Sequence, residues 1–388
     1  GLVRKVMDEI GPRESCGENE KKLGRLLVDE WKPVCDRVSV EPFTCAPTAF
    51  LGFFPYMVVA YLLGVIFYWV YAPLSLLFAL ICDSMFFFEM VRYREFLDPL
   101  FPKKEGENIV GVIKPRGEVR RRVIVSGHMD SAYEFNLWYF LKQAAIPVMV
   151  IAALSALILT GGSLAKTIAM FKGNAGAEIY MIIGIVCTAL YPVMGLFFFF
   201  HTYNPVPGAM DDMSGVAVTA GVGKYLNEAK GKGEFFPENT EVVLFGCAAE
   251  EAGLRGAKRF VSKHREELKA IPSYCLFLDG VYDERFLAVI TREINPGAKH
   301  SPELIRMAEE VAAGNGWKMK RSIIPLGASD AAAFSLAGIP SVCLLCQDTS
   351  GLVPNYHTRL DTIDYVRPES LAVMLQIVIG MIERIDKS

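Results

Sequence analysis

Hydrophobic and polar positions divide this chain into two kinds of segment. Three long stretches contain no Asp, Glu, Lys or Arg: 42–82, 143–165 and 179–210. A helix of about 20 apolar residues crosses a bilayer, so the first stretch is long enough for two spans, which Pro73 separates. The predicted spans are 50–70 and 73–90 in a first hairpin, and 138–160 and 179–200 in a second. A polar loop over 161–178 is expected between the last two spans.

The other segments alternate between strand-like and helix-like patterns. Apolar runs of strand length occur at 108–113, 122–126, 241–246, 274–278, 286–291 and 339–345. Helical stretches occur at 213–228, 253–270, 301–313 and 369–386. Alternation of this kind is typical of a largely parallel sheet covered by helices. We therefore predict an α/β fold with a single mostly parallel (mixed) sheet flanked by helices, plus four transmembrane helices in two inserted hairpins.

The predicted soluble part is one domain made of residues 1–46, 93–137 and 205–388, with hairpins 47–92 and 138–204 inserted into it. Composition supports this division, because 52% of the residues are hydrophobic, only 21% are charged, and the mean hydropathy is +0.30. A purely soluble protein rarely has such values. The alternative is four buried helices in a soluble or oligomeric core, but such helices are usually shorter and keep a polar face.

Side chains that can bind metal follow several of the predicted strands. Ligand sites in parallel sheets form at the carboxyl ends of strands, so these side chains are expected to meet. They are His128 and Asp130 in GHMDS, Asp211 and Asp212 in PGAMDDMSG, Glu250 and Glu251 in AAEEAGLRGA, Asp279 in LDG, and His357 in YHTRLDT. Two histidines and several carboxylates suit zinc, and a pair of zinc ions uses the whole set.

The adjacent glutamates Glu250 and Glu251 have a chemical rationale of their own. Neighbouring side chains leave the backbone in different directions, so one can bind a metal while the other faces the water that the metal activates. One site then holds both a metal ligand and a general base.

Taken in order, these motifs resemble those of the co-catalytic di-zinc exopeptidases, family twenty-eight of the metallopeptidases (clan MH). The resemblance extends over nearly the whole chain outside the two hairpins. It implies two zinc ions per chain with these ligands: His128 on one ion, His357 on the other, Asp211 as the bridge, and Glu251 and Asp279 completing one shell each. It also implies that Glu250 is the general base, that Asp130 orients His128, and that Asp211 precedes a cis peptide bond to Asp212.

Two features depart from the family pattern. His128 and Asp211 are 83 residues apart, far more than in soluble relatives, because the second hairpin lies between them. In the segment GASDAAAFSLAGIP, where His commonly follows SD in the family, this chain has Ala331. Ser329 and Asp330 are the candidates for substrate binding in this segment.

The predicted activity is that of a metallo-aminopeptidase, in which two zinc ions hold a bridging water and Glu250 takes its proton. Two alternatives stay open. One is a glutaminyl-cyclase-like acyl transferase, which resembles this family but works with one metal. The other is a catalytically inactive membrane receptor or scaffold of the same fold. The complete set of ligands, with both His128 and Asp279 present, favours the peptidase.

Charge and cysteine content bear on partners and location. The formal net charge is −3 and the pI is about 6.1, so the basic field that nucleic-acid binding requires is absent. The predicted partners are peptide substrates and the lipid bilayer, and a homo-oligomer is left open. Four spans predict an integral, multi-pass membrane protein with all soluble parts on one face except the loop 161–178. Nine cysteines without the spacing of a disulfide framework favour a reducing compartment, so we expect the catalytic domain to face the cytoplasm.

Overall fold

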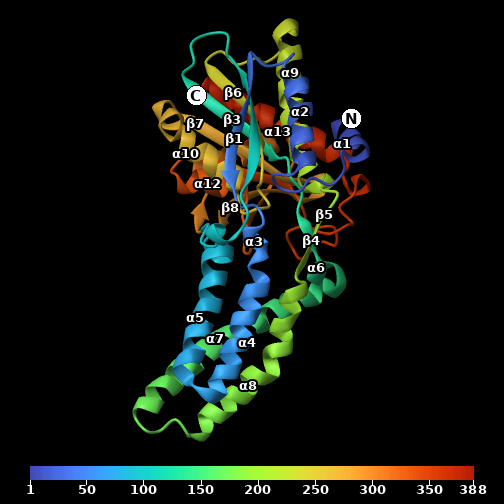
Figure 1. Cartoon of the computed structure of the whole chain (residues 1–388). Coiled ribbons are helices and arrows are strands. Elements are labelled where there is room, and N and C mark those ends of the chain that lie inside the picture. Colours follow the sequence, from blue (N-terminus) through green and yellow to red (C-terminus); the bar gives the residue numbers. More distant parts are fainter. The chain divides into compact units, whose positions relative to one another are not determined.

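The computed structural model describes residues 1–388, which form two compact units. Unit 1 comprises Gly1–Pro47, Pro102–Glu134 and Asn204–Ser388, and unit 2 comprises Thr48–Phe101 and Phe135–Tyr203. Strands β4 (Tyr133–Phe135) and β5 (His201–Pro205), which form a separate two-stranded sheet, contain two of the points where the chain passes between the units. Figure 1 labels the elements of both units.

Unit 1 is built around a nine-stranded sheet. Its spatial order is β1 (Arg37–Cys45), β2 (Lys104–Ile113), β6 (Thr240–Cys247), β3 (Arg121–His128), β7 (Ser273–Val281), β11 (Ser341–Cys346), β8 (Leu287–Glu293) and β10 (Lys320–Ile324), and β9 (Ala298–Lys299) also pairs with β8. Neighbours from β6 to β11 are parallel, as are β8 and β10. The pairs β1–β2, β2–β6, β11–β8 and β8–β9 are antiparallel. The parallel centre aligns the carboxyl ends of β6, β3, β7 and β11 at one edge.

The six predicted strand runs all correspond to strands of this sheet, which confirms the predicted α/β class with a mixed sheet. The hydrophobic pattern does not predict β1 or β10. Both are end strands of the sheet order, their side chains are mostly exposed or half-buried, and they carry charged residues such as Glu41 and Arg321. An edge strand pairs on one side only and commonly carries charged side chains, so its hydrophobic pattern is weak.

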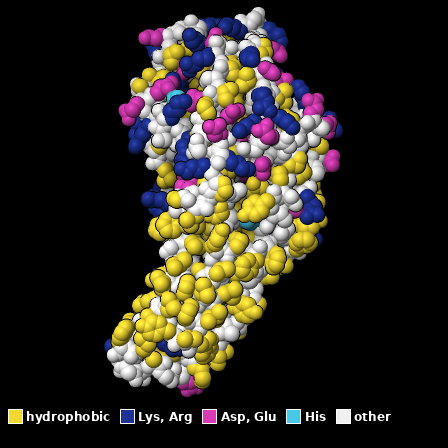
Figure 2. Space-filling model, in the orientation of Figure 1, with side chains coloured by type: hydrophobic (Ala, Val, Ile, Leu, Met, Phe, Trp, Pro, Cys, Tyr) yellow, Lys and Arg dark blue, Asp and Glu magenta, His cyan; other side chains and the backbone are white.

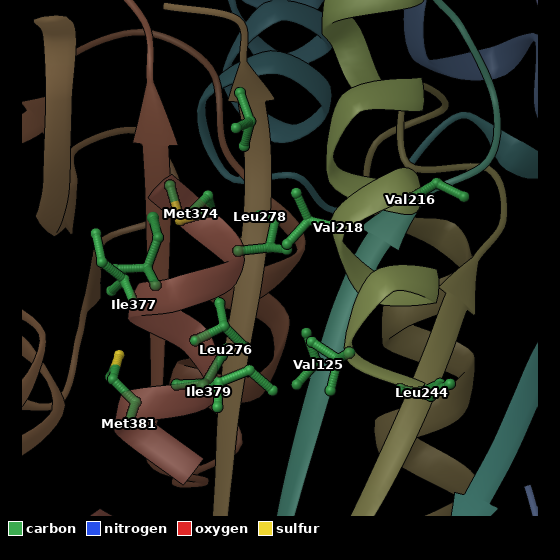
Figure 3. Packing of buried hydrophobic residues seen from close by; sticks show 14 of the residues in the cluster. Val125, Val216, Val218, Leu244, Leu276, Leu278, Met374, Ile377, Ile379 and Met381 are labelled. Carbon is green, nitrogen blue, oxygen red and sulfur yellow. The ribbon is translucent and has the colours of Figure 1, made fainter. Parts of the chain in front are cut away.

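Two hydrophobic clusters occupy the two faces of the sheet. Successive strand residues point to opposite faces, so Val123 and Val125 of β3 belong to one cluster and Ile124 to the other. The first face is covered by α1 (Leu2–Glu9), α2 (Glu18–Trp31), α9 (Ser214–Lys232), α11 (Pro302–Gly314) and α13 (Pro368–Lys387), and the second by α10 (Arg255–Ala270) and α12 (Asp330–Leu336). Figure 3 shows side chains of α9 and α13 packed on β3, β6 and β7. These packed layers fix the strands that carry the candidate site.

Unit 2 consists mainly of helices. The longest are α4 (Phe54–Val70), α5 (Ala72–Met85), α7 (Ala145–Phe171) and α8 (Glu178–Gly195), accompanied by α3 (Ala49–Gly52), α6 (Asn136–Leu141) and a π-helical segment at Phe86–Val91. Four segments are long and apolar enough to cross a membrane: Ala49–Val70, Ala72–Val91, Asn136–Phe171 and Glu178–Phe199. In Figure 2 hydrophobic side chains cover the visible surface of unit 2, whereas unit 1 displays many charged ones.

The polar loop predicted over 161–178 is wrong in its first part. Helix α7 continues to Phe171, and α8 begins at Glu178. The two glycines at 161 and 162 do not end the helix. Gly162 instead allows α7 to approach α8, because a Cβ at this position would lie 2.5 Å from Cγ2 of Ile183. Small residues serve such close helix contacts in membranes, and a local sequence pattern does not separate this use from a turn.

Candidate metal centre

The candidate residues of unit 1 converge at the carboxyl ends of neighbouring strands. His128 is the last residue of β3, Asp279 lies near the end of β7, and Glu250 and Glu251 follow β6. His357 lies in the loop between β11 and α13. Because β6, β3 and β7 are adjacent and parallel, their ends bring side chains from distant parts of the sequence to one place.

Asp211 stands between the two histidines. It belongs to the turn Ala209–Met213 that precedes α9. Its Oδ1 is 3.0 Å from Nε2 of His128, and its Oδ2 is 3.1 Å from Nε2 of His357. The same nitrogen of His357 is 3.2 Å from Oε1 of Glu251. One carboxylate therefore presents a different oxygen to each histidine.

Potential ligand atoms lie within 4.8 Å of one another in three groups: His128 with Asp211 and Asp279, Asp211 with Glu251 and His357, and His128 with Glu250 and Glu251. The first two groups share only Asp211, so they describe two adjacent positions for a metal ion. Every member of the three groups is buried or half-buried. Imidazole nitrogen and carboxylate oxygen are donors that zinc accepts. The donor set of this chain therefore fits two ions of this kind.

Asp130 holds both glutamates and the first histidine in place. Its Oδ1 accepts a hydrogen bond from the backbone N–H of Glu250 at 3.1 Å and lies 3.3 Å from Nδ1 of His128. Its Oδ2 accepts from the N–H of Glu251 at 3.0 Å and from the hydroxyl of Ser15 at 2.6 Å. Sequence motifs do not indicate Ser15, which is 115 residues from Asp130 and meets it only through the fold.

Asp212, which follows a cis peptide bond from Asp211, is fully buried and belongs to none of the three groups. Its Oδ2 accepts from the backbone N–H of His128 at 3.0 Å, and its Oδ1 accepts from that of Gly215 at 2.9 Å. This side chain thus ties the end of β3 to the start of α9.

Asp361 also holds the turn that contains Asp211. Its two carboxylate oxygens accept the backbone N–H groups of Met210 at 2.8 Å and of Asp211 at 3.1 Å. Asp361 is part of the motif that contains His357, but the motif alone does not predict a role for it. Its contacts show that this segment holds the backbone of Asp211 in addition to contributing His357.

Arg13 is a buried residue of the site that the motifs did not single out. It has no exposed surface, and its guanidinium donates to the carbonyls of Met129 at 2.8 Å and Gly208 at 2.7 Å. Gly208 adopts a φ of +66°, and a Cβ there would lie 2.4 Å from Cβ of Ser131. Arg13 therefore joins the segments that lead to the candidate metal centre, and the close packing requires glycine at 208.

The charges of this cluster perturb one another strongly. Burial, followed by repulsion from Asp211, raises the pKa of Asp279 to about 7. Burial also raises the pKa of Glu250 and of Glu251. Burial by itself lowers the pKa of His357, but the carboxylates around it outweigh burial and raise that pKa to about 10. A buried site with more carboxylates than histidines favours a bound divalent cation, which would offset the repulsion.

Ser329 and Asp330 lie at the start of α12 and are both buried. The Ser329 hydroxyl donates to Oε1 of Glu293 at 2.5 Å, and its backbone N–H donates to Oε2 of the same residue at 3.0 Å. Burial raises the pKa of Asp330 to about 7. Neither residue belongs to the three groups of potential metal ligands, and their role in substrate binding stays a prediction.

Comparisons with known proteins agree with the geometry of unit 1. The profile of peptidase family M28 matches residues 195–382, which is slightly less than half of the chain. No curated protein is matched. The fold resembles those of solved zinc aminopeptidases and glutaminyl cyclases.

Three solved structures illustrate this likeness. A zinc aminopeptidase from Bacillus subtilis has 15% sequence identity and a TM-score of 0.56, with 99% of this chain and 93% of that chain covered. A glutaminyl cyclase from an Acidobacteriales bacterium has 15% identity and a TM-score of 0.57, covering 100% and 92%. The LapA aminopeptidase of Legionella pneumophila has 12% identity and a TM-score of 0.56, covering 100% and 70%. At these identities the comparison establishes the fold and not the reaction.

Proposed function

We propose that this chain is a membrane-integral, zinc-dependent exopeptidase of the M28 type, and that it acts as an aminopeptidase on peptides. The observation that carries the proposal is the position of Asp211 between His128 and His357, with a different oxygen toward each. The match to the M28 profile and the similarity to zinc aminopeptidases support the same function.

Two zinc ions per chain would share Asp211 in this proposal. His128 and Asp279 would complete the protein ligands of one ion, and Glu251 and His357 those of the other. Bound zinc would supply Lewis-acid activation of water and of the scissile carbonyl. All five side chains come from unit 1, so the proposed chemistry is contained in that unit.

Glu250 is the proposed general base. Its Oε2 lies 4.0 Å from Nε2 of His128, so its carboxylate faces the same space as the potential ligands. A carboxylate there can take a proton from the attacking water and return it to the amine of the leaving peptide. Asp130 contacts both the backbone of Glu250 and the ring of His128, and we assign it a positioning role.

Substitution of the base tests the mechanism. For Glu250→Gln we expect kcat to fall by about 10²–10⁴-fold while zinc content stays at the wild-type level. Amino-acid anilides should be hydrolysed and their N-acetylated forms should not, because an aminopeptidase requires a free α-amine. Glu266→Gln, an exposed position on α10, is the matched control. Near-normal hydrolysis by Glu250→Gln would exclude Glu250 as the base.

Metal stoichiometry tests the shared ligand. Elemental analysis of the purified wild-type chain should give two zinc ions. Asp279→Asn and His357→Ala should each lose one ion, whereas Asp211→Asn should lose both, because it removes a ligand common to the two positions. One zinc ion in the wild type would contradict the two-ion proposal.

A glutaminyl-cyclase-like reaction is the second candidate, because solved glutaminyl cyclases have the same fold at similar TM-scores. The two reactions give different products. An aminopeptidase releases free amino acids from peptides, whereas a cyclase releases ammonia from an N-terminal glutamine. Ammonia release from a glutaminyl peptide, with one zinc ion per chain, would replace the proposal with this alternative. A chain with neither activity and no bound zinc would be a receptor or scaffold.

The four candidate spans of unit 2 support the proposed membrane insertion as two hairpins. The protein should then stay in the membrane fraction after carbonate washing and require detergent for extraction. We further propose that unit 1 faces the cytoplasm. Cys35 is the one cysteine that is not buried, so a membrane-impermeant maleimide should label it only after cells are opened. If the maleimide labels the wild type in intact cells and Cys35→Ser abolishes that labelling, unit 1 faces the outside of the cell instead.

A further inference from the structure

A cavity of about 470 Å³ lies within unit 2. Helices α4, α5, α7 and α8 and the segments that follow α5 and α8 all contribute to its walls. Met57, Met194 and Phe197 are buried at the cavity, whereas Leu80 and Leu157 are among its exposed lining residues. Its volume lies within the range of ligand pockets, about 300–1,000 Å³. The cavity is therefore large enough for a small molecule.

Asp83 is the one charged residue that lines this cavity. It lies near the middle of the candidate span Ala72–Val91. Its Oδ2 accepts a hydrogen bond from the hydroxyl of Thr160 at 2.6 Å, and its Oδ1 has no donor from the protein. No ion pair involves Asp83. A carboxylate at this depth is costly in a bilayer and commonly marks a functional site.

Several other polar side chains in unit 2 form hydrogen bonds within the helix bundle. The Ser75 hydroxyl, for example, donates to the carbonyl of Gly64 at 2.7 Å and lies 2.7 Å from the hydroxyl of Ser163. Ser75 and Ser163 are fully buried, as interhelical polar contacts require. Asp83 differs from these two serines, because it lines the cavity and only one of its two carboxylate oxygens has a protein donor.

The helix that carries Asp83 changes geometry at the cavity. After α5 the chain forms a π-helix over Phe86–Val91, and Phe86, Phe87, Phe88 and Val91 line the cavity wall. Asp83 and the π-helix that ends this candidate span therefore both contribute to the cavity wall.

We propose that this cavity binds a lipophilic primary amine, whose alkyl chain contacts the apolar walls and whose ammonium group bonds to Oδ1 of Asp83. A cation suits the site because a charge-assisted hydrogen bond would both satisfy the free oxygen and neutralise the carboxylate. The inference rests on the proposed insertion of unit 2 into the membrane and not on the peptidase activity of unit 1.

The probe for the test is a twelve-carbon primary amine with a diazirine in its chain, photolysed with the full chain in phosphatidylcholine nanodiscs. Mass spectrometry should locate the label on cavity residues such as Met57 or Met149. Dodecylamine should compete at least about tenfold more effectively than dodecanol or dodecanoate, because only the amine brings a positive charge to the carboxylate of Asp83. Equal competition by all three would overturn the assignment of an amine.

Matched variants separate the site from general lipid labelling. Asp83→Asn should lower labelling at least about tenfold through loss of the charged acceptor, and Ala153→Phe should lower it by filling the cavity. The controls are Glu178→Gln and Ala165→Phe, exposed positions in unit 2 that do not line the cavity. Each variant must match the wild type in size-exclusion profile and in melting temperature. Labelling of Asp83→Asn within twofold of the wild type would refute the proposal, whereas extraction of the chain without detergent would refute the membrane insertion instead.

Discussion

Arg359 forms a two-point ion pair with Glu134. The guanidinium donates from Nε to Oε1 at 2.7 Å and from a terminal nitrogen to Oε2 at 2.8 Å, and the backbone N–H of Arg359 donates to Oε1 at 3.1 Å. Arg359 is two residues after His357, so this pair fixes the loop that carries a proposed zinc ligand to the segment after β3. The Glu134 side chain is 7% exposed and that of Arg359 is 57% exposed.

The ion pair predicts a defined dependence of stability on pH. The hydrogen bonds from Arg359 hold the pKa of Glu134 below its ordinary value. The stabilisation that the ionised Glu134 carboxylate contributes is therefore complete above the ordinary glutamate pKa of about 4.3. It is lost as the pH falls through the lowered pKa of Glu134. At pH 7, Glu134→Gln should lower the stability of unit 1 by roughly 1 kcal/mol, a small value because Arg359 is half exposed. The difference in melting temperature from the wild type should disappear in acid, and a constant difference down to pH 3 would contradict this explanation.

Asp130→Asn should weaken zinc binding without removing a ligand. An amide has one acceptor oxygen, so it cannot accept from Glu250, Glu251 and Ser15 while it also orients His128. Loss of such a partner of a ligating histidine typically lowers metal affinity by about 10–100-fold. Competition with a chromogenic chelator measures this affinity. Asp8→Asn, an exposed position on α1, should bind zinc like the wild type.

Arg13→Lys should destabilise unit 1 although it conserves the charge. A lysine cannot reproduce the fork of hydrogen bonds to the carbonyls of Met129 and Gly208, so at least one buried carbonyl would lose its donor. An unsatisfied buried group costs about 1–3 kcal/mol. We expect a lower melting temperature and reduced activity, whereas Arg4→Lys on the exposed part of α1 should change neither. If Arg13→Lys keeps the melting temperature of the wild type, the paired hydrogen bonds of the Arg13 guanidinium are dispensable for stability.

Cys16 and Cys45 should form a disulfide under oxidation. Their Sγ atoms are 3.5 Å apart and both side chains are buried, whereas a disulfide bond is about 2.0 Å long, so a small shift suffices. Diamide would accept the two thiol hydrogens as the bond forms. Mass spectrometry of tryptic peptides should then detect the two segments joined by a disulfide. This disulfide should raise the free energy of unfolding by about 2–4 kcal/mol. In Cys16→Ser no link should form. Persistence of both thiols in the wild type after prolonged treatment would contradict the prediction.

The sequence by itself determined the main elements of both units. Apolar runs of strand length located the central strands, since buried strands need continuous hydrophobic residues, and uncharged stretches located the four candidate spans. The order of motifs identified the residues that the fold brings together, from His128 to His357. Such features are visible in a sequence because each depends on residues that are close together along the chain.

The tertiary structure decided what depends on residues far apart in sequence. Three sets of hydrogen bonds link segments more than 100 residues apart. Ser15 donates to Asp130, the buried guanidinium of Arg13 donates to distant carbonyls, and Asp361 accepts from the turn that contains Asp211. In unit 2, contacts between helices decided two further features: Gly162 of α7 lies close to Ile183 of α8, and Asp83 lines a cavity bounded by several helices. Local patterns report burial and periodicity, whereas these contacts arise only when the packed sheet and helices bring distant polar groups within hydrogen-bond distance.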